Sequence, residues 1–142
     1  MANEDRYFSD GEIRSQPDHM AYRQTLPQNA SADGNRKTML LGKVQNFLDV
    51  VVKCYGDIAF ADTTTTTIKL QSSSDDGVAD AYADVVDLYA VTASGAATVT
   101  NGTEMGRYTI NTTQELYWKV VITTTDAAAT GSVNVFAVGQ NR

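Results

Sequence analysis

The chain contains very little cysteine, proline and histidine. Among its 142 residues there is one cysteine, Cys54, with two prolines and one histidine. A single cysteine excludes a disulfide within the chain, and no cysteine pair is present to build a zinc site. We therefore expect a fold that is stabilised by packing alone.

Long apolar runs are also absent. No stretch of about 18 apolar residues occurs, and residues 1–20 lack an apolar segment preceded by positive charge. The sequence therefore predicts neither a membrane span nor a signal peptide. We expect a protein that is made and used in solution, in a reducing cytoplasm.

Positive charge is scarce, because 11 basic residues face 17 acidic ones and the net charge is -6. Nucleic-acid binding requires a clustered basic surface, so we expect no nucleic-acid partner. Residues 1–46 carry equal numbers of basic and acidic residues, and the whole negative charge lies in residues 47–142. A charge-balanced segment can lie against a mixed-charge surface without long-range repulsion.

Residues 1–46 and 47–142 follow different patterns. The first region is polar, is interrupted by Gly11, Pro17, Pro27 and Gly34, and sustains neither a strand nor a helix period. The second is a succession of short Val, Thr and Tyr runs between turn residues. We predict an extended, largely irregular N-terminal arm over residues 1–46 and a β-sandwich domain over residues 47–142.

The predicted arm has few apolar side chains with which to form a core. Ordering its backbone costs roughly 1 to 2 kcal/mol per residue, whereas each buried apolar side chain returns only about 1.5 to 3 kcal/mol. The two contributions cancel at best, and the apolar residues are scattered. We therefore expect the arm to be disordered or to be ordered by a partner.

Alternation of apolar and polar residues predicts short strands in the second region. They cover residues 47–54, 63–71, 107–111, 115–122 and 132–138, with a short helical turn followed by a strand in residues 78–92. Trp118 is the predicted centre of the core. The last strand is apolar on both faces, which indicates a central strand or a subunit contact.

Seven or eight short strands predict an all-β fold, a jelly-roll-like antiparallel β-sandwich. An immunoglobulin-like sandwich is the alternative. It is disfavoured because no cysteine pair brackets Trp118, although many such domains lack that disulfide.

The sequence contains no catalytic or metal-binding constellation. His19 follows Asp18 in the predicted arm, where a general base would lack rigid support. Asp75, Asp76 and Asp80 lack the spacing of an EF-hand, and we interpret them as an acidic loop tip in which Asp75 or Asp76 caps a helical turn. We expect no enzymatic activity, no metal and no cofactor.

Four stretches carry a family resemblance: IKLQSSSDDGVADAY, MGRYTIN, ELYWKVVITTT and GSVNVFAVGQNR. In this order they resemble the small jelly-roll cement, or decoration, proteins of tailed-bacteriophage capsids. The resemblance implies a structural virion protein, assembled in the host cytoplasm, that binds the outside of a phage head as a homotrimer. Its partner would be the major capsid protein, with the N-terminal arm clamping neighbouring subunits and stabilising the capsid.

Arginine and aromatic side chains dominate the energetics of protein interfaces. On that basis the predicted capsid contacts in the arm are Arg6, Tyr7, Phe8, Arg14, Tyr22 and Arg23. For a closed trimer the predicted oligomer interface consists of Tyr89, Tyr117, Val133 and Val135.

Two other classes of function remain open. A carbohydrate- or receptor-binding module of a phage tail or baseplate would use Tyr89 and Tyr117 as a sugar platform. An enzyme such as a virion hydrolase would require an acidic pair in a cleft.

Overall fold

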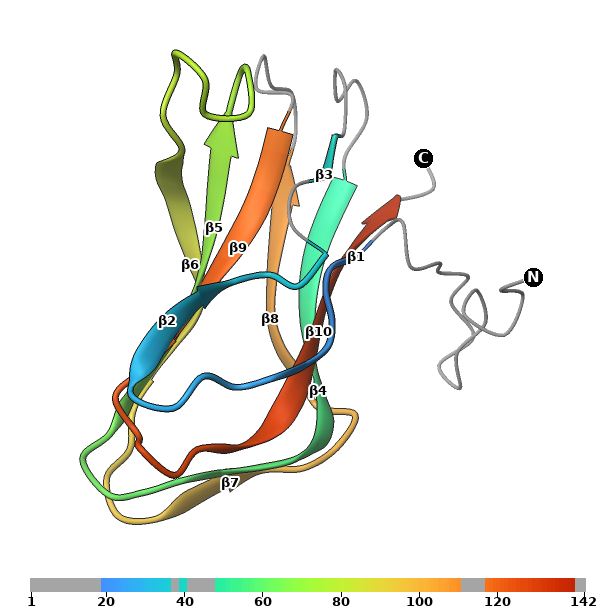
Figure 1. Cartoon of the computed structure of the whole chain (residues 1–142). Coiled ribbons are helices and arrows are strands. Elements are labelled where there is room, and N and C mark those ends of the chain that lie inside the picture. Colours follow the sequence, from blue (N-terminus) through green and yellow to red (C-terminus); the bar gives the residue numbers. More distant parts are fainter. Residues whose placement is uncertain (1–18, 37–38, 41–47, 111–116, 140–142) are drawn as a thin grey trace.

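The computed structural model describes residues 19–36, 39–40, 48–110 and 117–139. Within these residues all regular secondary structure is β-strand, arranged in two antiparallel five-stranded sheets that pack face to face (Figure 1). The prediction of an all-β sandwich is therefore confirmed. The jelly-roll connectivity stays a prediction.

The first sheet has the order β1 (His19–Thr25), β10 (Thr130–Gly139), β4 (Leu48–Phe60) and β7 (Ala97–Val99). A fifth strand, β8 (Glu104–Ile110), also pairs with β4. The length of β4 makes this possible, because residues 58–60 pair with β7 and residues 48–53 pair with β8. The central place of β10 confirms one of the two alternatives predicted for the last strand.

The second sheet has the order β2 (Ala30–Asp33), β9 (Tyr117–Thr124), β5 (Thr65–Ser73) and β6 (Ala83–Thr92), with β3 (Met39–Leu40) also paired to β9. Successive strands of the chain often lie in different sheets, as β9 and β10 do. The ten strands over the described residues exceed the seven or eight predicted, mainly because β1, β2 and β3 lie in the predicted arm.

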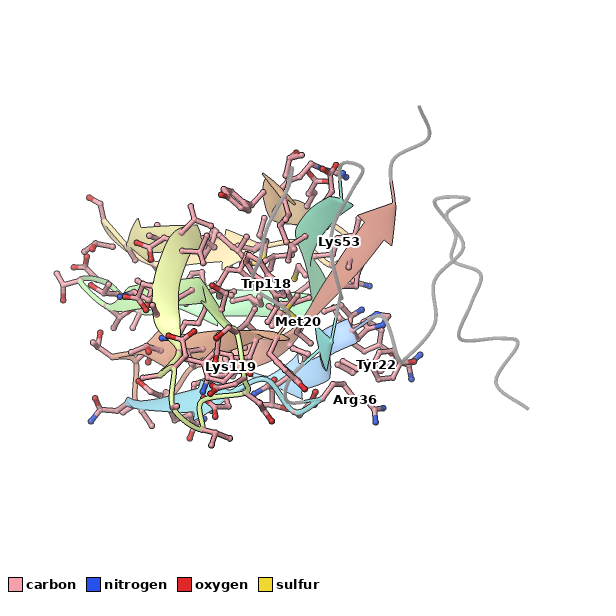
Figure 2. All side chains as sticks on the ribbon, turned by 90° about the horizontal axis from the view of Figure 1, so that it is seen from above. Met20, Tyr22, Arg36, Lys53, Trp118 and Lys119 are labelled. Carbon is pink, nitrogen blue, oxygen red and sulfur yellow. The ribbon has the colours of Figure 1, made fainter. Side chains whose placement is uncertain are left out.

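The core lies between the two sheets and follows the predicted alternation. On β9, Trp118, Val120 and Ile122 are buried, as are Val50 and Val52 on β4. Figure 2 shows Trp118 and Met20 inside the sandwich, between its two layers. The predicted inward register of these strands is therefore confirmed.

Residues 19–36 belong to the sandwich. Strand β1 pairs with β10 and β2 pairs with β9, and Met20, Ala21 and Leu26 are buried in the core. The prediction of an irregular arm is therefore wrong for this segment. A few apolar residues suffice here because they complete a core supplied by other strands. The remaining parts of the predicted arm, residues 1–18, 37–38 and 41–46, lie outside the described residues.

The loop between β5 and β6 contains turns and bends but no helix over residues 74–80. The predicted helical turn is therefore wrong, whereas the strand after it is present as β6. The Asp75 carboxylate instead accepts the backbone N–H groups of Val78, Ala79 and Asp80. Three donors on one side chain fold this loop without helical bonds.

Candidate docking surface

Strand β1 is irregular at its centre. Its pairing with β10 shifts between Ala21 and Gln24, and Arg23 has a φ of 48°, in the left-handed region. The backbone N–H of Arg23 donates to Oδ1 of Asn134 on β10 at 2.6 Å. Bulges of this kind redirect side chains, and backbone strain of about 1 to 3 kcal/mol persists only where the surroundings hold it. Asn134 is the group that holds Arg23.

The outer edge of β1 is held by side chains. Asn35 donates from Nδ2 to the carbonyl of Tyr22 at 2.9 Å, and its Oδ1 accepts from the N–H of Tyr22 at 2.8 Å. Gln24 accepts from the N–H of Asn35 at 2.8 Å and donates to the carbonyl of Asp33 at 3.0 Å. Since β1 ends its sheet, these groups replace the strand partner that an edge lacks.

A tight turn after β2 connects the second sheet to β1. The N–H of Gly34 donates to the carbonyl of Val120 at 2.9 Å, and the N–H of Arg36 donates to the carbonyl of Met20 at 3.2 Å. A Cβ atom on Gly34 would lie 2.2 Å from the Met20 carbonyl oxygen, so only glycine fits this approach. The turn thereby fixes the backbone of Arg36 beside β1.

Two arginines and two tyrosines alternate on this part of the surface. The Arg36 Cζ lies 5.2 Å from the centroid of the Tyr22 ring, and the Arg23 Cζ lies 5.0 Å from the same ring. Arg23 also lies 4.8 Å from the Tyr55 ring of β4. These are cation–π distances. We name these four residues the arginine–tyrosine ladder; Tyr22 and Arg36 lie together at one margin of the molecule (Figure 2).

The ladder adjoins three buried side chains of the first sheet, His19, Phe136 and Val51. The Tyr22 ring meets the His19 ring edge-on at 5.0 Å, and His19 lies 5.4 Å from the Phe136 ring. Phe136 pairs with Val51 across β10 and β4, and both side chains are fully buried. Strand β10 therefore carries buried apolar groups on both faces, as the sequence predicted.

Arg23 keeps its charge available to a partner. Arg23 and Arg36 are exposed, and Tyr55 is 40% exposed. No carboxylate among the described residues forms an ion pair with Arg23. A guanidinium held between aromatic faces retains donors in a fixed, planar arrangement.

Arg107 on β8 shows the opposite arrangement. It contacts Asp49 at 2.5 Å and Glu104 at 2.8 Å, and the Thr109 hydroxyl donates to Asp49 at 2.7 Å. Hydrogen bonding to Glu104 and Asp49 raises the pKa of Arg107, and the bond from Arg107 lowers the pKa of Glu104. Asp49 is buried. This arginine is neutralised by its own chain.

The structure brings together the two predicted capsid contacts that it describes, Tyr22 and Arg23. It adds Arg36 and Tyr55, which the sequence did not single out. Tyr55 continues the alternation of residues 47–54 on its outward side, so that pattern could have identified it. The remaining predicted contacts lie outside the described residues; they are Arg6, Tyr7, Phe8 and Arg14.

The four residues of the predicted oligomer interface lie in different environments in the structure. Val133 and Val135 are fully buried between the two sheets, so the prediction that they form a subunit contact is wrong. Tyr89 packs against the core and stacks on Phe60 at 6.5 Å, and burial raises its pKa. Tyr117 alternates with the buried Trp118 and so faces outward. An interface role for Tyr89 and Tyr117 stays a prediction.

Cys54 and Asp75, two titratable groups outside the ladder, serve the fold. Burial raises the pKa of the Cys54 thiol, which disfavours the reactive thiolate. The N–H of Ala79 is the main cause of a lowered pKa at Asp75.

Over the part of the chain that the structure describes, no group of three or more His, Cys, Asp or Glu side chains could hold a metal ion. No helix in that part is long and apolar enough to cross a membrane.

Comparison with protein-family models and with curated proteins finds no match to the chain.

Proposed function

We propose that the protein is a structural, non-enzymatic capsid decoration protein that binds the outside of a tailed-phage head. The arginine–tyrosine ladder is the observation that carries this proposal, because it consists of residue types that dominate protein interfaces, and all of its members except the half-buried Tyr22 are exposed. The sequence resemblance supplies the kind of partner, the major capsid protein.

Pre-organisation of the ladder supports a docking role. Asn134 and Asn35 fix the backbone of Arg23 and Tyr22 before any partner arrives. Binding then costs less side-chain and backbone entropy than it would for a flexible segment. Weak contacts repeated over a shell, and three times in a homotrimer, add through multivalency.

The proposed clamp combines the ladder with the segment that precedes it. Residues 1–18 lead directly into β1 and contain Arg6, Tyr7, Phe8 and Arg14. A chain of this length spans at most about 60 Å when extended, which is enough to reach across a subunit boundary. The ladder would hold one capsid subunit while the preceding segment reaches its neighbour.

The test is co-sedimentation of the protein with phage heads that are isolated from cells in which the protein is produced. We expect the full chain to sediment with shells, and both the deletion of residues 1–18 and the Arg23→Ala/Tyr55→Ala variant to lose most of that binding. The deletion must stop at residue 18, because β1 and β2 follow. A Lys69→Ala variant, changed on the other sheet, is the matched control.

Failure of the full chain to associate with any shell would refute the proposal. Full-strength binding by both altered proteins would refute the role given to the ladder and to the preceding segment. The mass of the isolated protein, measured by light scattering, tests the homotrimer separately.

A further inference from the structure

A groove lies at one end of the second sheet, between the turn after β2 and the loop after β5. Its volume is about 670 Å³, and its lining includes Asp33, Asn35, Asp76, Gly77, Tyr82 and Lys119. This volume falls in the range of about 300 to 1,000 Å³ that is typical of small-molecule sites. The lining joins one aromatic ring with groups that donate and accept hydrogen bonds.

Lys119 connects the two sides of the groove. It projects from β9 (Figure 2). Its Nζ lies 3.3 Å from Oδ2 of Asp33 and 4.7 Å from the centroid of the Tyr82 ring. The Tyr82 hydroxyl donates to Oδ1 of Asp76 at 2.7 Å. The Asp33 side chain is 60% exposed, so its carboxylate is accessible from the groove.

The loop that forms one wall is rigidly built. Asp75 accepts three backbone N–H groups, and Asp80 accepts both the N–H and the hydroxyl of Ser74. Asp76 and Gly77, which come directly after Asp75 in the chain, have φ values of 62° and 78°, in the left-handed region. Asp75 and Asp80 therefore hold the loop, whereas the Asp76 carboxylate is directed to Tyr82 in the groove.

We propose that this groove binds a neutral saccharide of about two sugar units. Sugar hydroxyls donate and accept at once, which suits the carboxylates of Asp33 and Asp76 beside the ammonium of Lys119. Two carboxylates against one ammonium leave the groove negative, so anionic sugars are disfavoured. The Tyr82 ring, over which the Lys119 ammonium lies, supplies the apolar part of the lining that the C–H groups of a sugar would contact.

The groove and the ladder adjoin at Asn35, which lines the groove and is hydrogen-bonded to Tyr22, but they extend over different sheets. Lys119 projects from the second sheet, whereas Arg23 reaches the Tyr55 ring on the outer face of the first. The saccharide site does not depend on the decoration role, and it differs from the platform of Tyr89 and Tyr117 predicted from the sequence.

The test is a glycan array that carries neutral and anionic oligosaccharides, probed with the full chain. We expect binding to neutral glycans, followed by saturable NMR shifts of the Tyr82 and Lys119 amides with the best neutral disaccharide. Tyr82→Ala and Asp33→Asn should each weaken that binding at least tenfold. Tyr117→Ala, changed on the same strand as Lys119 but outside the groove, should bind as the wild type does.

An array without neutral hits, or one that prefers anionic glycans, would overturn this assignment. So would wild-type affinity in Tyr82→Ala. If Tyr82→Ala does not fold, Lys119→Met replaces it, and unchanged binding by that variant would have the same meaning. None of these results bears on co-sedimentation with shells, so the two proposals fail separately.

Discussion

Arg107 and Arg23 belong to the same sheet but are held by opposite means. Arg107 contacts the carboxylates of Asp49 and Glu104, whereas Arg23 lies between the uncharged rings of Tyr22 and Tyr55. In the first arrangement carboxylates of the same chain neutralise the arginine, and these ion pairs stabilise the fold. The second fixes the guanidinium in place and leaves its charge for another molecule.

The comparison separates two roles that the sequence alone does not distinguish. Carboxylates neutralise the charge of an arginine. Aromatic rings orient its guanidinium group but leave most of that charge uncompensated. The strained φ of Arg23 fits this division, because strain that is retained at an exposed position indicates function. Substitutions at the two arginines should therefore affect different measurements.

The largest effect on stability is expected from Arg107→Met. Removing the guanidinium takes a charged partner from the buried carboxylate of Asp49, and it should lower the free energy of unfolding by about 2 to 3 kcal/mol. Urea denaturation measures this change. The matched control is Lys69→Met, which breaks the exposed ion pair to Asp84 and should cost less than about 1 kcal/mol. Equal costs for the two variants would contradict the structural role of Arg107.

Arg23→Ala should act on binding instead. We expect its affinity for shells to fall roughly 30-fold, about 2 kcal/mol as for an interface hot spot. Its free energy of unfolding should change by less than about 1 kcal/mol, since only cation–π contacts at an exposed site are lost. Arg23→Lys, which keeps the charge but not the planar group, should give an intermediate affinity. An Arg23→Ala variant that loses stability but keeps its affinity for shells would contradict the distinction drawn between the two arginines.

The smallest effect is the pH dependence that comes from carboxyl groups with a lowered pKa, of which Glu104 beside Arg107 is one. The hydrogen bond from Arg107 lowers the pKa of Glu104, and the N–H of Ala61 lowers that of Asp126. A lowered carboxyl pKa stabilises the fold above the unfolded value, and that stabilisation is lost as the pH falls through the folded value. Stability should therefore decline once the pH drops below the ordinary glutamate value of 4.5.

Urea midpoints measured between neutral and acid pH check this expectation. Glu104→Gln removes one of the carboxyl groups whose pKa is lowered, so its midpoint should fall less steeply on acidification than that of the wild type. An unchanged slope would show that Glu104 does not contribute to the acid sensitivity.

The sequence predicted the strands that have a regular period. Alternation located β9, with Trp118, Val120 and Ile122 facing inward, and the two apolar faces of β10 indicated its central position. These features depend on local pattern, because a strand with one buried face must alternate. The same pattern at Tyr55 would have found one member of the ladder.

The sequence did not predict β1 and β2, because their pairing is not local. Tyr22 and Arg23 lie in a bulge that has no period of two, and Asn134, which accepts from the Arg23 N–H, is far away in the chain. The role of Gly34 also depends on a close approach to Met20 that no pattern records. A segment with few apolar residues can still fold when distant strands supply the rest of its core.

Electron cryo-microscopy of phage heads that carry the protein tests the central claim most directly. The account predicts density for the sandwich on the outer surface of the shell, with Tyr22, Arg23, Arg36 and Tyr55 against the major capsid protein and Lys119 turned toward solvent. A sandwich that contacts the shell through the second sheet, with the arginine–tyrosine ladder exposed, would contradict it.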